Sequence, residues 1–162
     1  MSSSAPSPRP PPRTRIKICG ITRVEDAHAA AMSGADAIGL VFYPPSPRHV
    51  SVVQAREIAR SLPPFVSVVT LFVNATPEFV SEVIDQVRPA LLQFHGDETP
   101  EECACHDYPY IRAARMREGL DLLEFATRFS TSQALVLDAD QPGYGGGGEV
   151  FDWSRIPANV AL

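Results

Sequence analysis

The sequence predicts an α/β protein built on a parallel sheet, because short apolar runs alternate with amphipathic segments along the chain. The apolar runs are rich in Val, Ile and Leu, as buried parallel strands are. The segments between them carry helix-start signals and apolar residues at helical spacing. The chain of 162 residues therefore holds about six βα units, the last of them incomplete.

The limits of the expected strands follow the apolar runs, which cover residues 16–19, 37–42, 66–73, 90–94, 110–116 and 134–138. Four of the helices begin at caps: Thr22 with Glu25, Ser51 with Gln54, Thr76-Pro77 and Thr99-Pro100. The first helix ends near Gly34, and Pro63 stops the second. A fifth helix is expected over residues 119–129.

Side-chain parity separates the two architectures that this alternation allows, an open doubly wound sheet and a (β/α)₈ barrel. Alternate residues of a strand point to opposite faces. Several strands then have one apolar face and one face that turns polar near its carboxyl end: Lys17 with Cys19, Thr70 with Asn74, Gln93 with His95, and Asp138. In a barrel such ends converge on one site, so we expect a TIM-barrel type of fold with about six of its eight βα units present.

Cys19 and Asp138 are the candidate catalytic pair. Cys19 ends the first strand, and Lys17 on the same face favours the thiolate, which can act as a base. Asp138 ends the sixth strand, where a partly dry barrel mouth is expected to raise the carboxyl pKa and keep a proton available. The competing interpretations are a small buried hydrophobe for Cys19 and a loop or cap aspartate for Asp138.

Three further residues are candidates for substrate binding. Arg48 follows a proline-rich loop, and a stiff loop can aim a guanidinium at a carboxylate, although a solvated surface arginine fits the sequence too. Gln93 and His95 either line the site or pack structurally. The loop from Gly143 to Gly148 contains G-x-G-x-x-G, but no helix opens on it, so a flap over the site or a plain flexible loop is expected.

Composition excludes several other classes of function. A net charge of −5 gives no reason to expect nucleic acid, and any bound anion must be held by local groups. Three cysteines argue against a disulfide framework and suit a reducing cytoplasm. Cys103, Cys105 and His106 lack a second ligand pair, so we expect a helix end there and no metal. No apolar stretch approaches the roughly 20 residues of a membrane span.

The chain divides into a tail and one domain. Residues 1–14 are rich in Ser, Pro and Arg and have no apolar centre, so they are expected to be a disordered tail and not a secretory signal. A start codon placed too far upstream would explain them equally well. Residues 15–162 form the expected partial-barrel domain.

Short motifs between about residue 15 and residue 155 resemble those of the phosphoribosylanthranilate isomerase family. Their order and spacing make the resemblance specific. They are Lys17-Ile18-Cys19-Gly20-Ile21-Thr22, Gly34-Ala35-Asp36-Ala37, Phe42-Tyr43-Pro44 with Ser46-Pro47-Arg48, Leu71-Phe72-Val73-Asn74, Gln93-Phe94-His95-Gly96, and Leu137-Asp138 with Gly145-Gly146 and Phe151-Asp152-Trp153.

The resemblance implies a TIM barrel that works without a cofactor on a small phosphorylated substrate in tryptophan biosynthesis. The implied reaction is the Amadori rearrangement of N-(5-phosphoribosyl)anthranilate to 1-(2-carboxyphenylamino)-1-deoxyribulose 5-phosphate. Carried onto this chain, Asp138 protonates the ribose ring oxygen, Cys19 removes the proton at C2′, and Arg48 pairs with the anthranilate carboxylate. Gly145 and Gly146 join Gln93 and His95 as candidates for substrate binding.

The chain departs from this pattern in length. A barrel of this kind needs eight strands and at least about 200 residues, and the family's phosphate site follows its last two strands. We therefore expect a shortened chain with weak activity that associates through two open sheet edges. Two alternatives remain: an inactive remnant completed by a partner or a second copy, and a doubly wound nucleotide-binding domain that uses the glycine loop.

Overall fold

The structure is a computed structural model, and it describes residues 13–140 and 150–157. Its strands are β1 (Lys17–Cys19), β2 (Ala37–Phe42), β3 (Ser67–Phe72), β4 (Leu91–Phe94), β5 (Tyr110–Arg115) and β6 (Leu135–Asp138). Its helices are α1 (Val24–Met32), α2 (Val52–Ser61), α3 (Pro77–Val87), α4 (Pro100–Ala104), α5 (Leu122–Arg128) and the 3₁₀ turn η1 (Trp153–Arg155). The alternation predicted from the sequence is therefore confirmed.

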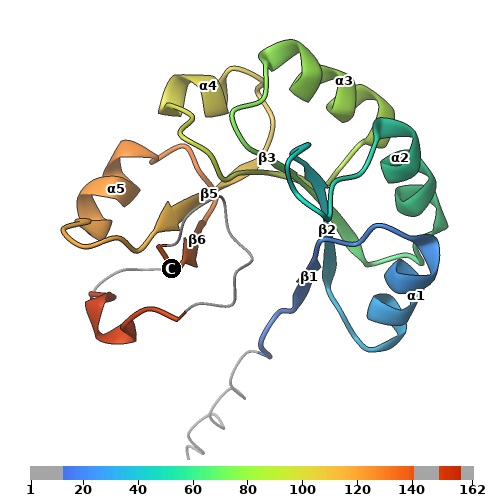
Figure 1. Cartoon of the computed structure of the whole chain (residues 1–162), viewed down its shortest axis with the longest axis horizontal. Helices are drawn as coiled ribbons and strands as arrows, with labels where there is room; N and C mark the ends of the chain where they lie inside the picture. Colours follow the sequence, from blue (N-terminus) through green and yellow to red (C-terminus); the bar gives the residue numbers. More distant parts are fainter. Residues whose placement is uncertain (1–12, 141–149, 158–162) are drawn as a thin grey trace, which may run out of the picture.

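The six strands form one parallel sheet whose spatial order is the order of the sequence, from β1 to β6. A doubly wound sheet reverses its strand order at a switch point, and this sheet has no such reversal. Figure 1 shows the sheet curling, with α1 to α5 along its outer side. The curved sheet and the one-sided helices confirm the barrel type of fold and rule out the doubly wound alternative.

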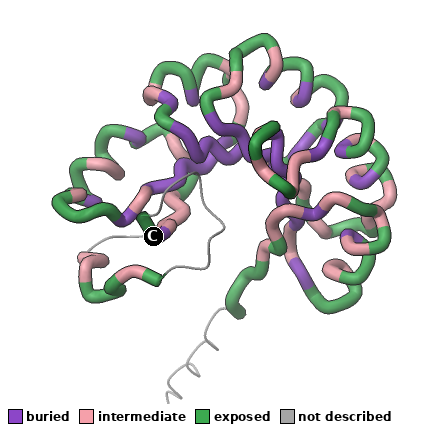
Figure 2. The backbone as a smooth tube through the Cα atoms, in the orientation of Figure 1, coloured by how far each residue is buried: buried purple, intermediate pink, exposed green. Residues whose placement is uncertain are grey.

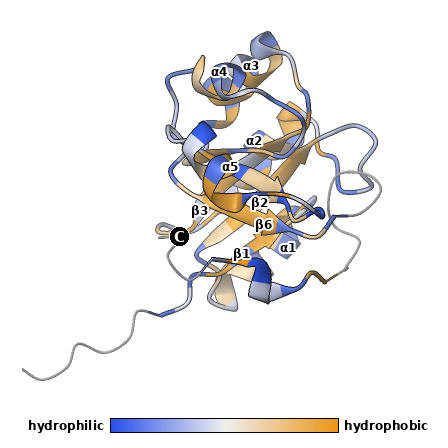
Figure 3. Ribbon diagram, turned by 90° about the vertical axis from the view of Figure 1, so that its left-hand side faces the viewer, coloured by the Kyte–Doolittle hydropathy of each residue, from blue (hydrophilic) through white to orange (hydrophobic). Residues whose placement is uncertain are grey.

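The main core lies between the outer face of the sheet and the helices. Its largest buried members include Phe42, Phe72 and Phe94, which stack or tilt against one another along the sheet with ring centroids 5.5 and 6.0 Å apart. Buried residues follow the strands and the inner sides of the helices in Figure 2, and Figure 3 shows hydrophobic residues concentrated on the strands. This packing fixes which side chains of each strand point inward, toward the concave face.

The concave face begins with a small apolar cluster and becomes polar toward β4 and β6. Val41, Leu71 and Val73 are buried there, with Cys19 and Tyr43 packed against them. The polar side of β3 was predicted wrongly, because Thr70 lies with the outer core and is fully buried. Leu71 and Val73 face inward instead. The parity predicted for β1, β4 and β6 agrees with the packing.

The helix caps follow the sequence with one exception. Ser51 and Thr99 form complete capping boxes with Gln54 and Glu102. The box predicted for Thr22 and Glu25 is wrong, because the extended residue Arg23 is the N-cap and α1 begins one residue later than the box requires.

The first and last described segments are both anchored. Arg13 and Arg15 form ion pairs with Asp36, directly before β2, while residues 1–12 of the predicted tail lie outside the described residues. Near the other end, the Arg155 guanidinium donates to the carbonyl of Met116, after β5. The longest described helix, α3, has 11 residues, and none of the described helices could cross a membrane.

Candidate active site

Cys19 is held at the carboxyl end of β1 by its neighbour on β2. Its register partner is Gly39, and a Cβ on Gly39 would lie only 2.7 Å from the Cys19 Sγ. That distance is shorter than any ordinary contact, so the thiol occupies the space that glycine leaves free. Lys17 lies two residues earlier on the same face. Cys19 is half-buried and packs against the apolar cluster on the concave face.

Arg48 lies directly beside Cys19. The loop before it is closed by a hydrogen bond from the Ser46 N–H to the Tyr43 carbonyl (2.9 Å), and Ser46 Oγ accepts from the Arg48 N–H (3.1 Å). The guanidinium crosses Gly20 and donates from Nη1 to the Cys19 carbonyl at 3.4 Å. The structure thus places the Arg48 cation on the backbone of Cys19, a residue 29 positions away in the sequence.

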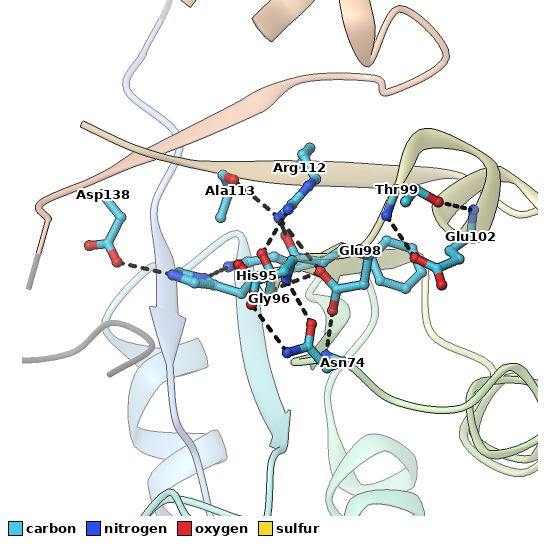
Figure 4. A network of polar contacts seen from close by, with 12 residues as sticks. Asn74, His95, Gly96, Glu98, Thr99, Glu102, Arg112, Ala113 and Asp138 are labelled. Carbon is cyan, nitrogen blue, oxygen red and sulfur yellow. Dashed lines mark hydrogen bonds and ion pairs between the residues drawn. The ribbon is translucent and has the colours of Figure 1, made fainter. Parts of the chain in front are cut away.

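Asp138 is the last residue of β6 and meets His95, which directly follows β4. The distance between Asp138 Oδ2 and His95 Nε2 is 3.0 Å, and Nδ1 of the same ring lies 3.1 Å from Gln93 Nε2. Figure 4 shows the His95 ring reaching toward Asp138. Gln93 and His95 are 2% and 6% exposed. The sequence left open whether these two residues line the site or only pack; in the structure His95 contacts the candidate acid, and Gln93 contacts His95.

The pKa of Asp138 differs from the expectation. Burial raises it, as predicted, but the hydrogen bond from His95 lowers it by more, and the Ala139 N–H and the charge of Arg115 act in the same direction. The carboxyl pKa therefore lies below its ordinary value. The prediction was wrong because the apolar sequence around Asp138 does not reveal a donor 43 residues away.

The turn that carries His95 is fixed by a buried ion pair that sequence reasoning missed. Glu98 accepts hydrogen bonds from the backbone N–H groups of Asn74 (2.7 Å) and Gly96 (2.8 Å). Arg112 donates to the carbonyls of Phe94 (2.8 Å) and Gly96 (2.7 Å), and lies 3.7 Å from Glu98 (Figure 4). The one signal in the sequence is a charged residue, Arg112, inside an apolar strand.

The remaining candidates lie elsewhere. Gly145 and Gly146 fall outside the described residues. Cys103 is buried in α4, where burial raises its thiol pKa to about 12, and His106 stacks on Phe94. Across residues 13–140 and 150–157, no group of three or more His, Cys, Asp or Glu side chains is placed to hold a metal ion.

A thiol, a guanidinium and a His-paired carboxyl at the carboxyl ends of parallel strands define an enzyme of the (β/α)₈-barrel class. The family model described as N-(5'-phosphoribosyl)anthranilate (PRA) isomerase matches residues 16–161. The chain belongs to this family, whose members are isomerases of tryptophan biosynthesis.

Relatives of known sequence support the same assignment. The N-(5'-phosphoribosyl)anthranilate isomerase of Leptothrix cholodnii is 61% identical over 150 residues, which cover 93% of this chain and 68% of that protein. The protein of the same name from Methylibium petroleiphilum is 57% identical over 148 residues, covering 91% of this chain and 70% of that one. The chain thus spans about two thirds of the length of these relatives.

Solved structures of the family share the fold. The phosphoribosyl anthranilate isomerase of Thermotoga maritima superposes with a TM-score of 0.78 at 43% identity, over 88% of this chain and 69% of that one. A second solved isomerase, in complex with reduced 1-(o-carboxyphenylamino)-1-deoxyribulose 5-phosphate, has a TM-score of 0.72 at 40% identity, over 79% of this chain and 66% of that one.

Proposed function

We propose that this chain isomerises N-(5-phosphoribosyl)anthranilate to 1-(2-carboxyphenylamino)-1-deoxyribulose 5-phosphate, with Asp138 as the acid and Cys19 as the base. The observation that carries the proposal is the placement of these two groups at the carboxyl ends of β6 and β1, on the inward face of a chain of this family. A solved relative that binds a reduced form of the product supports the substrate class.

Asp138 acts first. Because its pKa is lowered, the protonated carboxyl is the minor form near neutral pH, and this form is the one that reacts. Its proton passes to the ribose ring oxygen as the C1′–O bond breaks, and the nitrogen lone pair forms the C1′=N bond of a protonated Schiff base. Asp138 is left as a carboxylate. His95 hydrogen-bonds that carboxylate at 3.0 Å and so stabilises the form of Asp138 that exists after proton transfer.

Cys19 acts second. Its thiolate takes the proton from C2′, the C–H electrons form the C1′=C2′ double bond, and the electrons of the C1′=N bond return to nitrogen. The resulting enolamine takes a proton at C1′ and loses one from the C2′ hydroxyl, which gives the ketone. The overall change is a rearrangement within one molecule, so no oxidant or cofactor enters the balance.

Arg48 holds the aromatic acid. Its guanidinium lies next to the Cys19 carbonyl at 3.4 Å, so a carboxylate paired with it would place the attached ribose near the thiol. A guanidinium can bind both oxygens of a carboxylate at once, which fixes the orientation as well as the position of the ligand.

Steady-state turnover of phosphoribosylanthranilate by the whole chain tests the proposal. We expect Cys19→Ala and Asp138→Asn each to lower kcat by about 10²–10⁴-fold, the usual contribution of a general acid or base. Cys105→Ala removes an exposed thiol directly after α4 and is the matched control, expected to keep the original rate. Full activity in either test variant would refute the assigned roles.

We further propose that the chain associates with a second copy through its sheet edges. Among the described strands β1 pairs only with β2, and β6 only with β5. On β1 and just before it, Ile18 and Ile16 are 42% and 44% exposed, beside a groove that α1 lines. Unpaired strand edges with apolar neighbours favour pairing with another chain.

Sedimentation velocity across a range of concentrations tests this association. Ile18→Lys is expected to shift the chain toward monomer, while Val53→Lys, at a position on α2 that is 62% exposed, is the control. The alternative of a weakly active chain that a second copy completes makes a further prediction: the activity per chain should rise with protein concentration. Equal sedimentation of all three proteins as monomers would contradict the proposal.

A further inference from the structure

The Gln93 amide is buried and faces the ring of His95. Its Nε2 lies 3.1 Å from His95 Nδ1, and its Oε1 has no hydrogen-bond partner among the described residues. Gln93 is only 2% exposed, so solvent does not surround the amide. A buried amide costs free energy unless its hydrogen bonds repay it, so the contact with His95 is the principal polar interaction that holds this side chain.

The contact decides which nitrogen of His95 carries the proton. A neutral imidazole has one N–H donor and one acceptor nitrogen. When the Gln93 amide donates to Nδ1, that nitrogen is the acceptor and the ring proton lies on Nε2, which faces Asp138 Oδ2 at 3.0 Å. The ring can then donate to the Asp138 carboxylate but cannot accept a hydrogen bond from the protonated acid.

We propose that Gln93 is a positioning residue that selects the ring tautomer of His95 and thereby sets how tightly Asp138 holds its proton. The inference rests on the proposed role of Asp138 as the acid. With the amide turned by half a rotation, Oε1 accepts from Nδ1–H, and Nε2 becomes the acceptor for the protonated acid. In the orientation that the structure gives, the amide donor faces Nδ1 and selects the Nε2–H tautomer, which favours the carboxylate form of Asp138.

Other charges at the site are independent of Gln93. Arg115, the register partner of Asp138 on β5, lowers the carboxyl pKa through its charge. Lys17 and Cys19 share the inward face on β1. None of these side chains changes when only residue 93 is substituted, so a comparison among variants at that position isolates the effect of the amide.

Two substitutions separate the functions of the amide. Gln93→Glu keeps the length and the acceptor but removes the donor, so Nδ1 must be protonated. Gln93→Met keeps the length of the side chain and removes both its donor and its acceptor. The ring state of His95 is read from ¹⁵N–¹H correlation spectra of the whole chain without substrate, with His95→Asn identifying the signals among the four histidines.

In the unsubstituted chain at pH 8, we expect the proton on Nε2 and a coupling across the hydrogen bond between the Gln93 amide nitrogen and Nδ1. In Gln93→Glu we expect a proton on Nδ1. The alkaline limb of kcat/KM for the isomerase reaction should then move to higher pH by about one to two units. The new carboxylate at position 93 accepts from Nδ1–H and so stabilises the state in which His95 and Asp138 together hold two protons. In Gln93→Met the coupling is lost and the limb does not move up.

A ring state that is the same in all three proteins would overturn the inference, as would a proton on Nδ1 in the unsubstituted chain. If Gln93→Glu does not fold, the spectrum of the unsubstituted chain decides between these outcomes on its own. The spectra need no turnover, so a ring that responds to residue 93 in a chain without isomerase activity would contradict the proposed function and leave the tautomer selection standing.

Discussion

Nε2 of His95 lies 3.0 Å from Oδ2 of Asp138, although the two residues belong to the ends of β4 and β6, which are not neighbours in the sheet. The contact exists because the sheet curls, so that inward-facing side chains of alternate strands converge. In Figure 1 the curled sheet has β1 at one end and β6 at the other. The site is therefore a product of the barrel curvature and not of any single loop.

Acid should destabilise the fold partly through Asp138. Its pKa in the folded chain is lowered from the ordinary 3.8, first by the hydrogen bond from His95. A lowered carboxyl pKa contributes stability that is present above the ordinary value and is lost as the pH falls through the lowered one. We expect Asp138→Asn to flatten the decrease of the free energy of unfolding below about pH 4. Urea denaturation from pH 3 to pH 6 measures it, and the exposed Asp85→Asn is the control. If the free energy of unfolding of Asp138→Asn falls with pH as steeply as that of the unsubstituted chain, the stabilising contact between His95 and Asp138 would be contradicted.

Substitution of Gly39 by alanine should displace the Cys19 thiol. The new Cβ would lie 2.7 Å from Sγ, so the sulfur or the strand must move. We expect kcat to fall at least tenfold, since a misplacement of about 1 Å can cost 10²-fold. Gly34→Ala is the matched control, because Gly34 has φ +90° and open space at Cβ. It should lower stability by about 1–2 kcal/mol and leave kcat of the folded fraction unchanged. Equal kcat in both variants would contradict the steric role of Gly39.

Loss of the buried Arg112 should destabilise the turn that carries His95. Arg112 is 4% exposed and donates to two carbonyls at the end of β4, so Arg112→Met leaves these acceptors and Glu98 without their partner. We expect a loss of about 3–5 kcal/mol, as for other broken buried pairs. Arg23→Met breaks the exposed pair with Asp26 and should leave the unfolding midpoint nearly unchanged. Similar midpoints for both variants would show that the buried pair is not structural.

Removal of the Arg48 charge should weaken substrate binding more than it slows chemistry. A charge-assisted hydrogen bond is worth about 1.5–3 kcal/mol, so Arg48→Met is expected to raise KM by about 10–100-fold with a smaller change in kcat. Arg48→Lys keeps the charge but loses the paired donors, and we expect an intermediate KM. The exposed Arg60→Met on α2 is the control. An unchanged KM in Arg48→Met would rule out contact with the carboxylate.

The order of elements could be predicted from the sequence because the signals are local. Residues 37–42 were expected as a strand and form β2 with those bounds, and the capping box at Ser51 starts α2 as expected. The fifth helix was predicted too long, because Asp121 caps the backbone N–H groups of Leu123 and Glu124 and so sets the start of α5 at Leu122. Helix boundaries depend on such individual bonds, which periodicity does not report.

The candidate site could be predicted only in part. Parity was enough to place Cys19, Gln93, His95 and Asp138 on one face. It did not show that His95 contacts Asp138, and so the direction of the pKa of Asp138 was predicted wrongly. The supporting pair of Arg112 and Glu98 was missed for the same reason: long-range contacts between polar side chains follow from the curvature of the sheet and leave little trace in the local sequence.

The division of labour between Asp138 and Cys19 is tested most directly by the species that each single variant forms from substrate labelled with ¹³C at C1′. With Cys19→Ala, ring opening is intact and proton removal is blocked, so we predict the signal of the open-chain Schiff base without product. With Asp138→Asn, the substrate should stay in its cyclic form. Product formation by Cys19→Ala at the original rate, or a Schiff-base signal with Asp138→Asn, would contradict the account.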